Sequence, residues 1–242
     1  MAYLDIAFGN PVPNSVKEVM FDYLERIQVN GVAVERAKAY EVLGYLKSEF
    51  GSVVNAKPRE LALVKNTSEG LNIAANGIHF EKGDNVVLNE LEHLNNTYCW
   101  LRLKQKDVEI RVAPSTDGRV SIESLDSMID ENTKAVAIAS ITNLGLRFNI
   151  TEVSKLCREN NSILVVDAVQ SLGIEPIEVR KLGIDILSTS AHKGLLGPHG
   201  IGFFYCSDKL LDEIEPVYVA RTSFSSIDDP KTSELKDSCE KF

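Results

Sequence analysis

The sequence predicts an α/β fold, a three-layer sandwich in which a mostly parallel sheet lies between helices. Short apolar runs at 61–64, 86–88, 135–141, 163–166, 184–187 and 201–205 are typical of buried strands. Helical spacing of apolar residues separates several of them, as over 122–129 and 150–160. Strands that alternate with helices in this way are the signature of βαβ units.

The first helix is predicted near the N-terminus. Ser15 and Glu18 form a capping-box pattern, and apolar residues follow at helical spacing from Val16 to Ile27. We expect this helix to begin near Ser15 and to pack along one face. Beyond about Ser223 the composition shifts to Ser, Asp, Pro, Lys and Glu, so we expect a poorly ordered polar tail.

Composition excludes several classes of function. The net charge of -9 argues against binding to nucleic acid or to anionic membranes, which leaves small molecules or proteins as partners. No apolar run approaches the length of a membrane span and the N-terminus lacks a secretory pattern, so we expect a cytoplasmic protein. The cysteines show no CxxC or metal-ligand spacing, so no metal site is expected.

One lysine lies in a glycine-rich stretch directly after an apolar run. This residue is Lys193, and Asp167 likewise ends the apolar run 163–166. Open α/β sheets bind their ligands at such strand ends. A desolvated amine and a carboxylate are what pyridoxal phosphate requires, for its aldehyde carbon and its pyridine nitrogen respectively. The pair therefore suggests a pyridoxal 5'-phosphate site.

Two further features are ambiguous by themselves. Thr67 and Ser68 precede a helical pattern, where hydroxyls and backbone amides can hold a phosphate, although such residues are more often simple N-caps. His93 follows the apolar run 86–88, where it is either a surface histidine or a residue that stacks on a ligand ring.

Taken together, these motifs resemble the class V aminotransferases. This family of fold type I pyridoxal-phosphate enzymes includes cysteine desulfurases, selenocysteine lyases, kynureninases and isopenicillin-epimerase-like proteins. The resemblance rests on four spaced motifs, at 66–72, 92–93, 140–143 and 167–202, while residues 3–5 resemble the family's opening strand. It implies the large domain of the fold type I enzymes.

The resemblance also implies roles for single residues. Lys193 would form a Schiff base with the cofactor, Asp167 would face the pyridine nitrogen, and His93 would stack on the ring and take part in proton transfer. The other implied cofactor contacts are Thr67, Ser68, Asn143, Gln170, Ser190 and His192. Of these, Ser190 and His192 would reach the phosphate, whereas Asn143 and Gln170 would approach the phenolic oxygen.

The expected organisation has an N-terminal segment over 1–14, a cofactor-binding large domain over 15–223 and a polar tail over 224–242. Family chains continue beyond that point into a small domain, which carries an arginine for the substrate carboxylate and, in desulfurases, a mobile-loop cysteine. Arg221 is a candidate for the first role and lies in the segment 216–224, which resembles a family stretch near the neighbouring subunit's site. Cys239 is a candidate for the second role, but nothing around it resembles the desulfurase loop.

The expected function is that of a pyridoxal-phosphate-dependent transferase or lyase acting on an amino acid. Transamination, sulfur elimination and epimerisation all remain open. A truncated, non-catalytic cofactor-binding or scaffold protein and one half of a split enzyme are the alternatives. A nicotinamide-binding protein is disfavoured because no G-x-G-x-x-G follows the first strand. We expect a homodimer, or a hetero-assembly with a partner that supplies the C-terminal domain.

Overall fold

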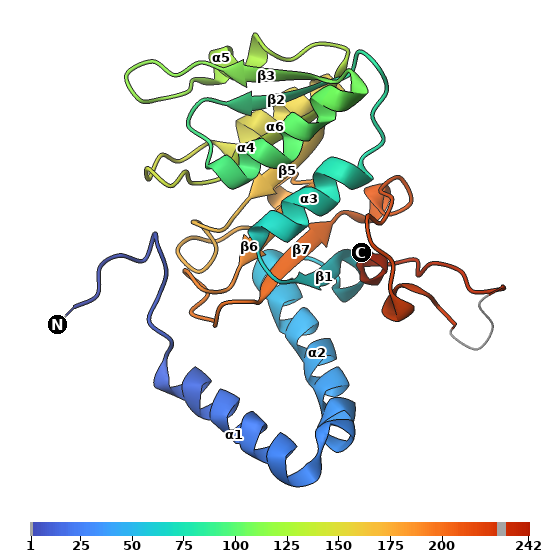
Figure 1. Cartoon of the computed structure of the whole chain (residues 1–242). Helices are drawn as coiled ribbons and strands as arrows, with labels where there is room; N and C mark the ends of the chain where they lie inside the picture. The colour runs from blue at the N-terminus through green and yellow to red at the C-terminus, as the bar shows by residue number, and fades with distance from the viewer. Residues whose placement is uncertain (1, 227–230) are drawn as a thin grey trace.

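A computed structural model describes residues 2–226 and 231–242 and shows one seven-stranded sheet in the order β1-β7-β6-β5-β4-β2-β3 (Figure 1). The strands are β1 Leu61–Val64, β2 Asn85–Asn89, β3 Glu109–Ala113, β4 Thr133–Ala139, β5 Ile163–Asp167, β6 Ile186–Ser190 and β7 Gly202–Cys206. β7 runs antiparallel to its neighbours β1 and β6, and every other pair is parallel. The prediction of a mostly parallel sheet is confirmed.

Helices cover both faces of the sheet. They are α1 Asn14–Asn30, α2 Val32–Val54, α3 Thr67–Gly77, α4 Leu94–Leu101, α5 Ile122–Asp126, α6 Ile150–Glu159 and α7 Val179–Leu182. In β5, Ile163 and Val165 pack with α3 and α4, whereas Leu164 and Val166 pack with α6 and the end of α2. Two cores on opposite faces explain why this strand is apolar from Ile163 to Val166, and they make three layers.

Several strands end at the same edge of the sheet. β1 and β6 both pair antiparallel with β7, so they run in the same direction, and Val64 and Ser190 both lie opposite Gly202. Further along the sheet, Asp167 at the end of β5 lies opposite Ala139 at the end of β4. The segments that follow these strands therefore meet at one edge, where the candidate site lies.

The N-terminal helices differ from the sequence prediction. α1 begins at Asn14 after Pro13 without a side-chain cap hydrogen bond, so the predicted capping box is wrong. α1 also buries no residue, so within this chain it does not pack along one face as predicted. Figure 1 shows α1 and much of α2 extending away from the sheet. α2 joins the body at its end, where the ring of Phe50 stacks on Phe203 with centroids 3.7 Å apart.

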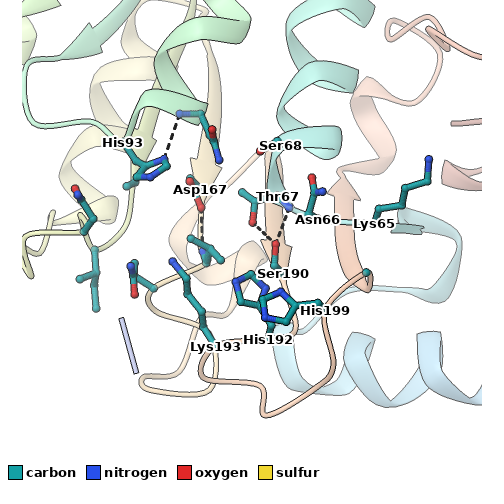
Figure 2. Close-up of a pocket in the computed structure, with 17 residues that line it drawn as sticks. Lys65, Asn66, Thr67, Ser68, His93, Asp167, Ser190, His192, Lys193 and His199 are labelled. Atoms are coloured by element: carbon teal, nitrogen blue, oxygen red, sulfur yellow. Dashed lines mark hydrogen bonds between the residues drawn. The ribbon is translucent and has the colours of Figure 1, made fainter. Parts of the chain in front are cut away.

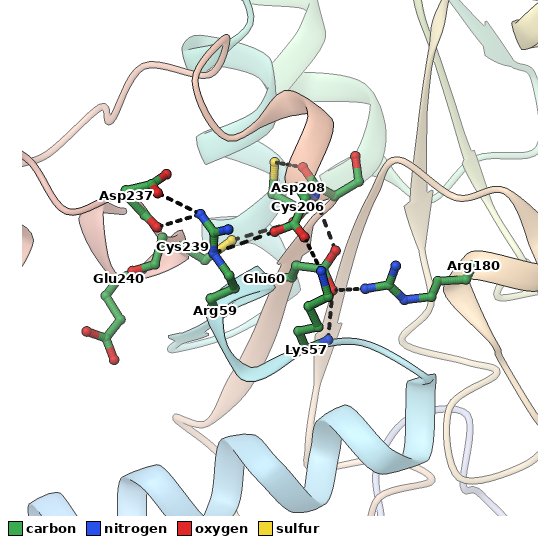
Figure 3. Close-up of polar contacts among 11 residues, drawn as sticks. Lys57, Arg59, Glu60, Arg180, Cys206, Asp208, Asp237, Cys239 and Glu240 are labelled. Carbon is green, nitrogen blue, oxygen red and sulfur yellow. Dashed lines mark hydrogen bonds and ion pairs between the residues drawn. The ribbon is translucent and has the colours of Figure 1, made fainter.

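The C-terminal segment packs on the sheet instead of being poorly ordered. Among residues 231–242, Cys239 and Lys241 are buried, and the ring of Phe242 packs edge-on against Phe204 with centroids 5.4 Å apart. Arg59 joins this segment to the body through an ion pair with Asp237 at 2.9 Å (Figure 3). The polar composition predicted poor order, but a few apolar side chains pack this segment against the body. Residues 227–230 of the predicted tail lie outside the described part of the chain.

Two further findings concern the remaining segments. Residues 3–5 form no strand, contrary to the resemblance with the family's opening strand. Within residues 2–226 and 231–242, no helix has the length and apolar character needed to cross a membrane.

Candidate active site

A pocket of about 400 Å³ at the carboxyl edge of the sheet collects every site residue predicted from the sequence (Figure 2). Its lining includes Thr67, Ser68, His93, Asn143, Asp167, Gln170, Ser190, His192 and Lys193. These residues come from five separate segments, so their meeting in one pocket is a property of the fold. Their individual roles remain predictions.

Lys193 lies in the loop between β6 and β7. The loop is closed by hydrogen bonds from the amide of Ala191 to the carbonyl of Ile201 at 2.9 Å and from the amide of Gly197 to the carbonyl of Ala191 at 2.8 Å. Gly197 has no room for a side chain, because a Cβ there would lie 2.6 Å from the Cβ of Ala191. The side-chain amide of Asn10 donates to the carbonyl of Lys193. The lysine is thus carried on a tightly held loop.

Asp167 is the buried acid of the pocket. Its Oδ1 accepts a hydrogen bond from the amide of Val169 at 3.0 Å. Burial raises the pKa of Asp167 to about 6, although the Val169 hydrogen bond and the charge of Lys193 oppose the shift. Burial lowers the pKa of Lys193, and the charge of Asp167 opposes that shift in turn. A cation placed next to this carboxylate would lower the cost of its burial.

Hydroxyls and amides gather at the start of α3. The amide of Thr67 donates to Ser190 Oγ at 2.7 Å, and the two hydroxyls lie 2.8 Å apart. Ser188 Oγ donates to the carbonyl of Thr67 at 2.9 Å. Gly70 permits this approach, because a Cβ there would lie 2.2 Å from Ser188 Oγ. The N-terminus of α3 is therefore held against the end of β6, in a geometry that suits an anion.

His93 lines the pocket and also caps α4. Its Nδ1 accepts a hydrogen bond from the amide of Asn95 at 3.2 Å. The neighbouring Glu92 is buried and accepts from the amide of Ala139 at 2.8 Å and from the side chain of Asn96 at 2.8 Å. Burial raises the pKa of Glu92 to about 7. Glu92 thus connects the start of α4 to the end of β4 and holds the backbone next to His93. This role of Glu92 was not predicted from the sequence.

The N-terminal segment lies beside the pocket. Gln170 Nε2 donates to the carbonyl of Ala7 at 3.0 Å, and the amide of Asn10 donates to the carbonyl of His192 at 2.9 Å. Arg221, the candidate for a substrate carboxylate, does not line this pocket and lies in the 3-10 helix Arg221–Ser223.

His199 is a pocket residue that sequence reasoning missed. Its ring stacks on that of His192, with centroids 4.3 Å apart and planes inclined by 22°. The signal was its position in the glycine-rich stretch after Lys193, between Pro198 and Gly200. Lys65, Asn66 and Asn95 also line the pocket without having been predicted.

The polar groups are distributed unevenly in the pocket. Figure 2 shows His192, His199 and Thr67 near Ser190, whereas Lys193 lies toward Asp167. One end therefore offers hydroxyls, amides and imidazoles for an anionic group, and the other offers a carboxylate for a cationic one. The arrangement suits a ligand that has an anionic and a cationic end and a carbonyl within reach of an amine.

Comparison with known proteins gives a consistent result. Residues 2–242 match the family Aminotransferase class-V. Probable cysteine desulfurases from Methanothermobacter thermautotrophicus and Pyrococcus abyssi are 35% and 33% identical to this chain. The matches cover 89% and 93% of this chain but only 55% and 58% of the relatives. The chain thus spans little more than half the length of these relatives.

Solved structures confirm the expected fold. An apo cysteine desulfurase from Thermococcus onnurineus NA1 has a TM-score of 0.89 at 28% identity, over 99% of this chain and 62% of that one. A cystine C-S lyase in complex with cysteine persulfide, 21% identical, has a TM-score of 0.90 over 98% of this chain and 65% of its own, and supports the fold alone. With the large-domain fold of fold type I enzymes and a match along its length, the chain belongs to the class V aminotransferase family.

Proposed function

We propose that this chain binds pyridoxal 5'-phosphate and is the cofactor-binding part of an enzyme of the cysteine desulfurase type. The observation that carries the proposal is the placement of Lys193 and Asp167 in one pocket, with the Thr67 and Ser190 hydroxyls at its other end. When bound, pyridoxal phosphate supplies an electron sink for the bond that breaks beside the substrate's amino group.

The polar groups of the pocket match the charged groups of the cofactor, which are its phosphate and its protonated ring nitrogen. Thr67, Ser190 and His192 would hold the phosphate at the N-terminus of α3, where the helix dipole adds to the attraction. Asp167 would accept a hydrogen bond from the protonated ring nitrogen, and this positive charge would stabilise the buried carboxylate. His93 would cover the ring face.

Two side chains remain for the edge of the ring that carries oxygen. Asn143 and Gln170 both line the pocket. The side chain of Gln170 is held by the carbonyl of Ala7, which restricts it to the region beside the Lys193 loop. These amides would orient the cofactor through its phenolic oxygen.

Lys193 is the group that would attach the cofactor. Its lowered pKa, caused by burial, favours the neutral amine that bonds to an aldehyde with loss of water. Once a substrate amine takes its place, the free Nζ would accept the proton from the substrate's α-carbon. Both tasks require the amine to be unprotonated at least part of the time, which the pocket promotes.

Cysteine is the proposed substrate, because the relatives above 30% identity are named cysteine desulfurases. All four cysteines of the chain are buried, and burial raises the pKa of both Cys99 and Cys157 to about 12. Cys239 is also fully enclosed, so none of the four presents an exposed thiolate that could accept sulfur. The acceptor would be an added thiol or a group outside these 242 residues.

We further propose that the chain works as a homodimer or together with a polypeptide that supplies what relatives carry in the rest of their length. In α1, Val19, Phe21 and Leu24 are 66%, 58% and 60% exposed, and apolar surface of this kind favours a covering partner. Size-exclusion chromatography with light scattering tests this, and a well-behaved monomer would contradict the homodimer.

The activity test uses the purified chain with pyridoxal phosphate, cysteine and a dithiol. Sulfide with alanine or pyruvate is expected from the wild type and not from Lys193→Ala, whereas Lys209→Ala, on the exposed surface, should match the wild type. Cofactor binding without any of these products would reject the cysteine activity and favour a non-catalytic binding protein. Turnover that appears only after the remaining portion of a relative is added would indicate a split enzyme.

A further inference from the structure

We propose that His199 is a second imidazole ligand of the cofactor's phosphate group and clamps it together with His192. This inference rests on the proposed function and adds a residue to the phosphate site. The ligand chemistry it requires is a phosphate monoester on an aromatic ring system.

The two imidazoles form one structural unit. They lie in the same β6–β7 loop, and their rings are stacked with centroids 4.3 Å apart. His192 is fixed from the N-terminal side, because its carbonyl accepts from the amide of Asn10. Gly200, with φ of +88°, turns the chain directly after His199 and brings the ring back over His192.

The stack lies beside the group of anion-binding donors. Both histidines line the same pocket as Thr67 and Ser190, and Figure 2 shows their rings next to Ser190. A phosphate at the start of α3 would therefore meet the N–H edges of the stack. His199 is exposed, so its ring is not held there by core packing.

The charge in this pocket is opposite in sign to that of the whole chain. Among the described residues that line it, Asp167 is the one acid, against the bases Lys65, His93, His192, Lys193 and His199. Asp5 lines an adjoining pocket that shares four of these bases. Three of the four histidines of the chain thus lie at one site, in a protein whose net charge is -9. Such a concentration of bases favours an anionic ligand.

The stack also predicts how pH acts on binding. The pKa of His192 is lowered by burial and by the charges of His199 and Lys193. The acids that line the space around the two rings are Asp167 and Asp5. An anionic phosphate beside the stack would favour the charged form of His192, so binding of the phosphate ester should be coupled to proton uptake by His192.

The test compares pyridoxal 5'-phosphate with pyridoxal, which differ only in the phosphate group. Dissociation constants are measured by calorimetry on the whole chain at about pH 7. His199→Ala should weaken binding of the phosphate ester about tenfold and leave pyridoxal binding unchanged. His199→Gln, which keeps an N–H donor, should recover part of the affinity for the phosphate ester. His79→Ala, at an exposed histidine outside the pocket, is the control.

The outcomes separate this inference from the proposed function. Wild-type protein that binds neither compound would contradict the proposed function itself. Wild-type binding with an unchanged constant in His199→Ala would overturn the role of His199 alone. An equal loss for both compounds would also overturn it, because the histidine would then act through the loop structure and not on the phosphate.

Discussion

The backbone of Gly173 lies directly against the backbone of Gly194. A Cβ on Gly173 would lie 2.1 Å from the carbonyl oxygen of Gly194, and Gly173 has φ of +83°. Gly173 ends the segment that begins at Asp167, and Gly194 follows Lys193. The contact therefore fixes the two loops that carry the acid and the amine relative to each other.

We expect Gly173→Ala to lower the free energy of unfolding by about 3 kcal/mol, because the new methyl group adds a clash to the backbone strain. Gly118→Ala is the matched control, since Gly118 has φ of +71° and open space around its Cβ position. That control should lose only about 1 kcal/mol. Urea unfolding measures both values, and equal losses would contradict a close approach of the two loops.

Ser190→Ala should weaken binding of pyridoxal phosphate about tenfold, because it removes the acceptor of the Thr67 amide and a hydroxyl at the phosphate end. Ser188→Ala also loses a hydrogen bond to Thr67, but Ser188 lies outside the pocket lining. Each variant should lose about 1 kcal/mol of stability. Fluorescence titration with the cofactor distinguishes them, and the same affinity in both variants would count against the proposed phosphate position.

Asp167 makes the stability of the cofactor-free chain fall as pH rises. Burial raises its pKa to about 6, above the ordinary value of an aspartate, so the folded state holds the proton more tightly than the unfolded state. Stability is therefore lost between about pH 4 and about pH 6. Asp167→Asn should stabilise the chain at neutral pH by on the order of 2 kcal/mol and should have little effect below about pH 4.

Thermal unfolding across this pH range, with and without the cofactor, measures the effect of Asp167→Asn. Bound cofactor should remove the variant's advantage, because the protonated ring nitrogen stabilises the ionised carboxylate. A variant that gains more stability in acid than at neutral pH would show that the carboxyl is not desolvated as the structure indicates.

Glu60 is a buried carboxylate that joins distant parts of the chain (Figure 3). It accepts from the amides of Lys57 and Asp208 at 2.7 and 3.2 Å and from the guanidinium of Arg180 at 2.6 Å. Glu60→Gln places an N–H group against these donors and should cost about 3 kcal/mol. Glu178→Gln, at an exposed pair, should change stability by less than about 0.5 kcal/mol. Guanidinium unfolding measures the stability of both variants. Similar losses of stability in Glu60→Gln and Glu178→Gln would refute the structural role of Glu60.

Part of the fold could be predicted from sequence because buried strands are continuous apolar runs. β1 has the predicted bounds, and β5 extends the predicted run by Asp167 alone. β3 was missed because it alternates charged and apolar residues at a partly exposed position in the sheet. α2 was missed because its apolar residues are spread around the helix and do not form one stripe.

The candidate site likewise has residues that the sequence predicts and residues that it does not. The pocket positions of Asp167, Lys193 and Thr67 could be predicted because each lies at or shortly after the end of a strand that the sequence reveals. The positioning role of Glu92 and the stacking of His199 could not, because both depend on contacts made after the elements fold together. Motifs indicate which residues face a ligand, whereas the groups that hold them come from segments without a motif.

Reduction with borohydride followed by peptide mass spectrometry tests whether Lys193 bonds to pyridoxal phosphate. We expect an absorption band at ~420 nm that borohydride removes, with the cofactor's mass retained on the peptide that contains Lys193. Lys193→Ala should show neither the band nor the label. Label spread over surface lysines, or an unchanged band in Lys193→Ala, would show that Lys193 does not attach the cofactor.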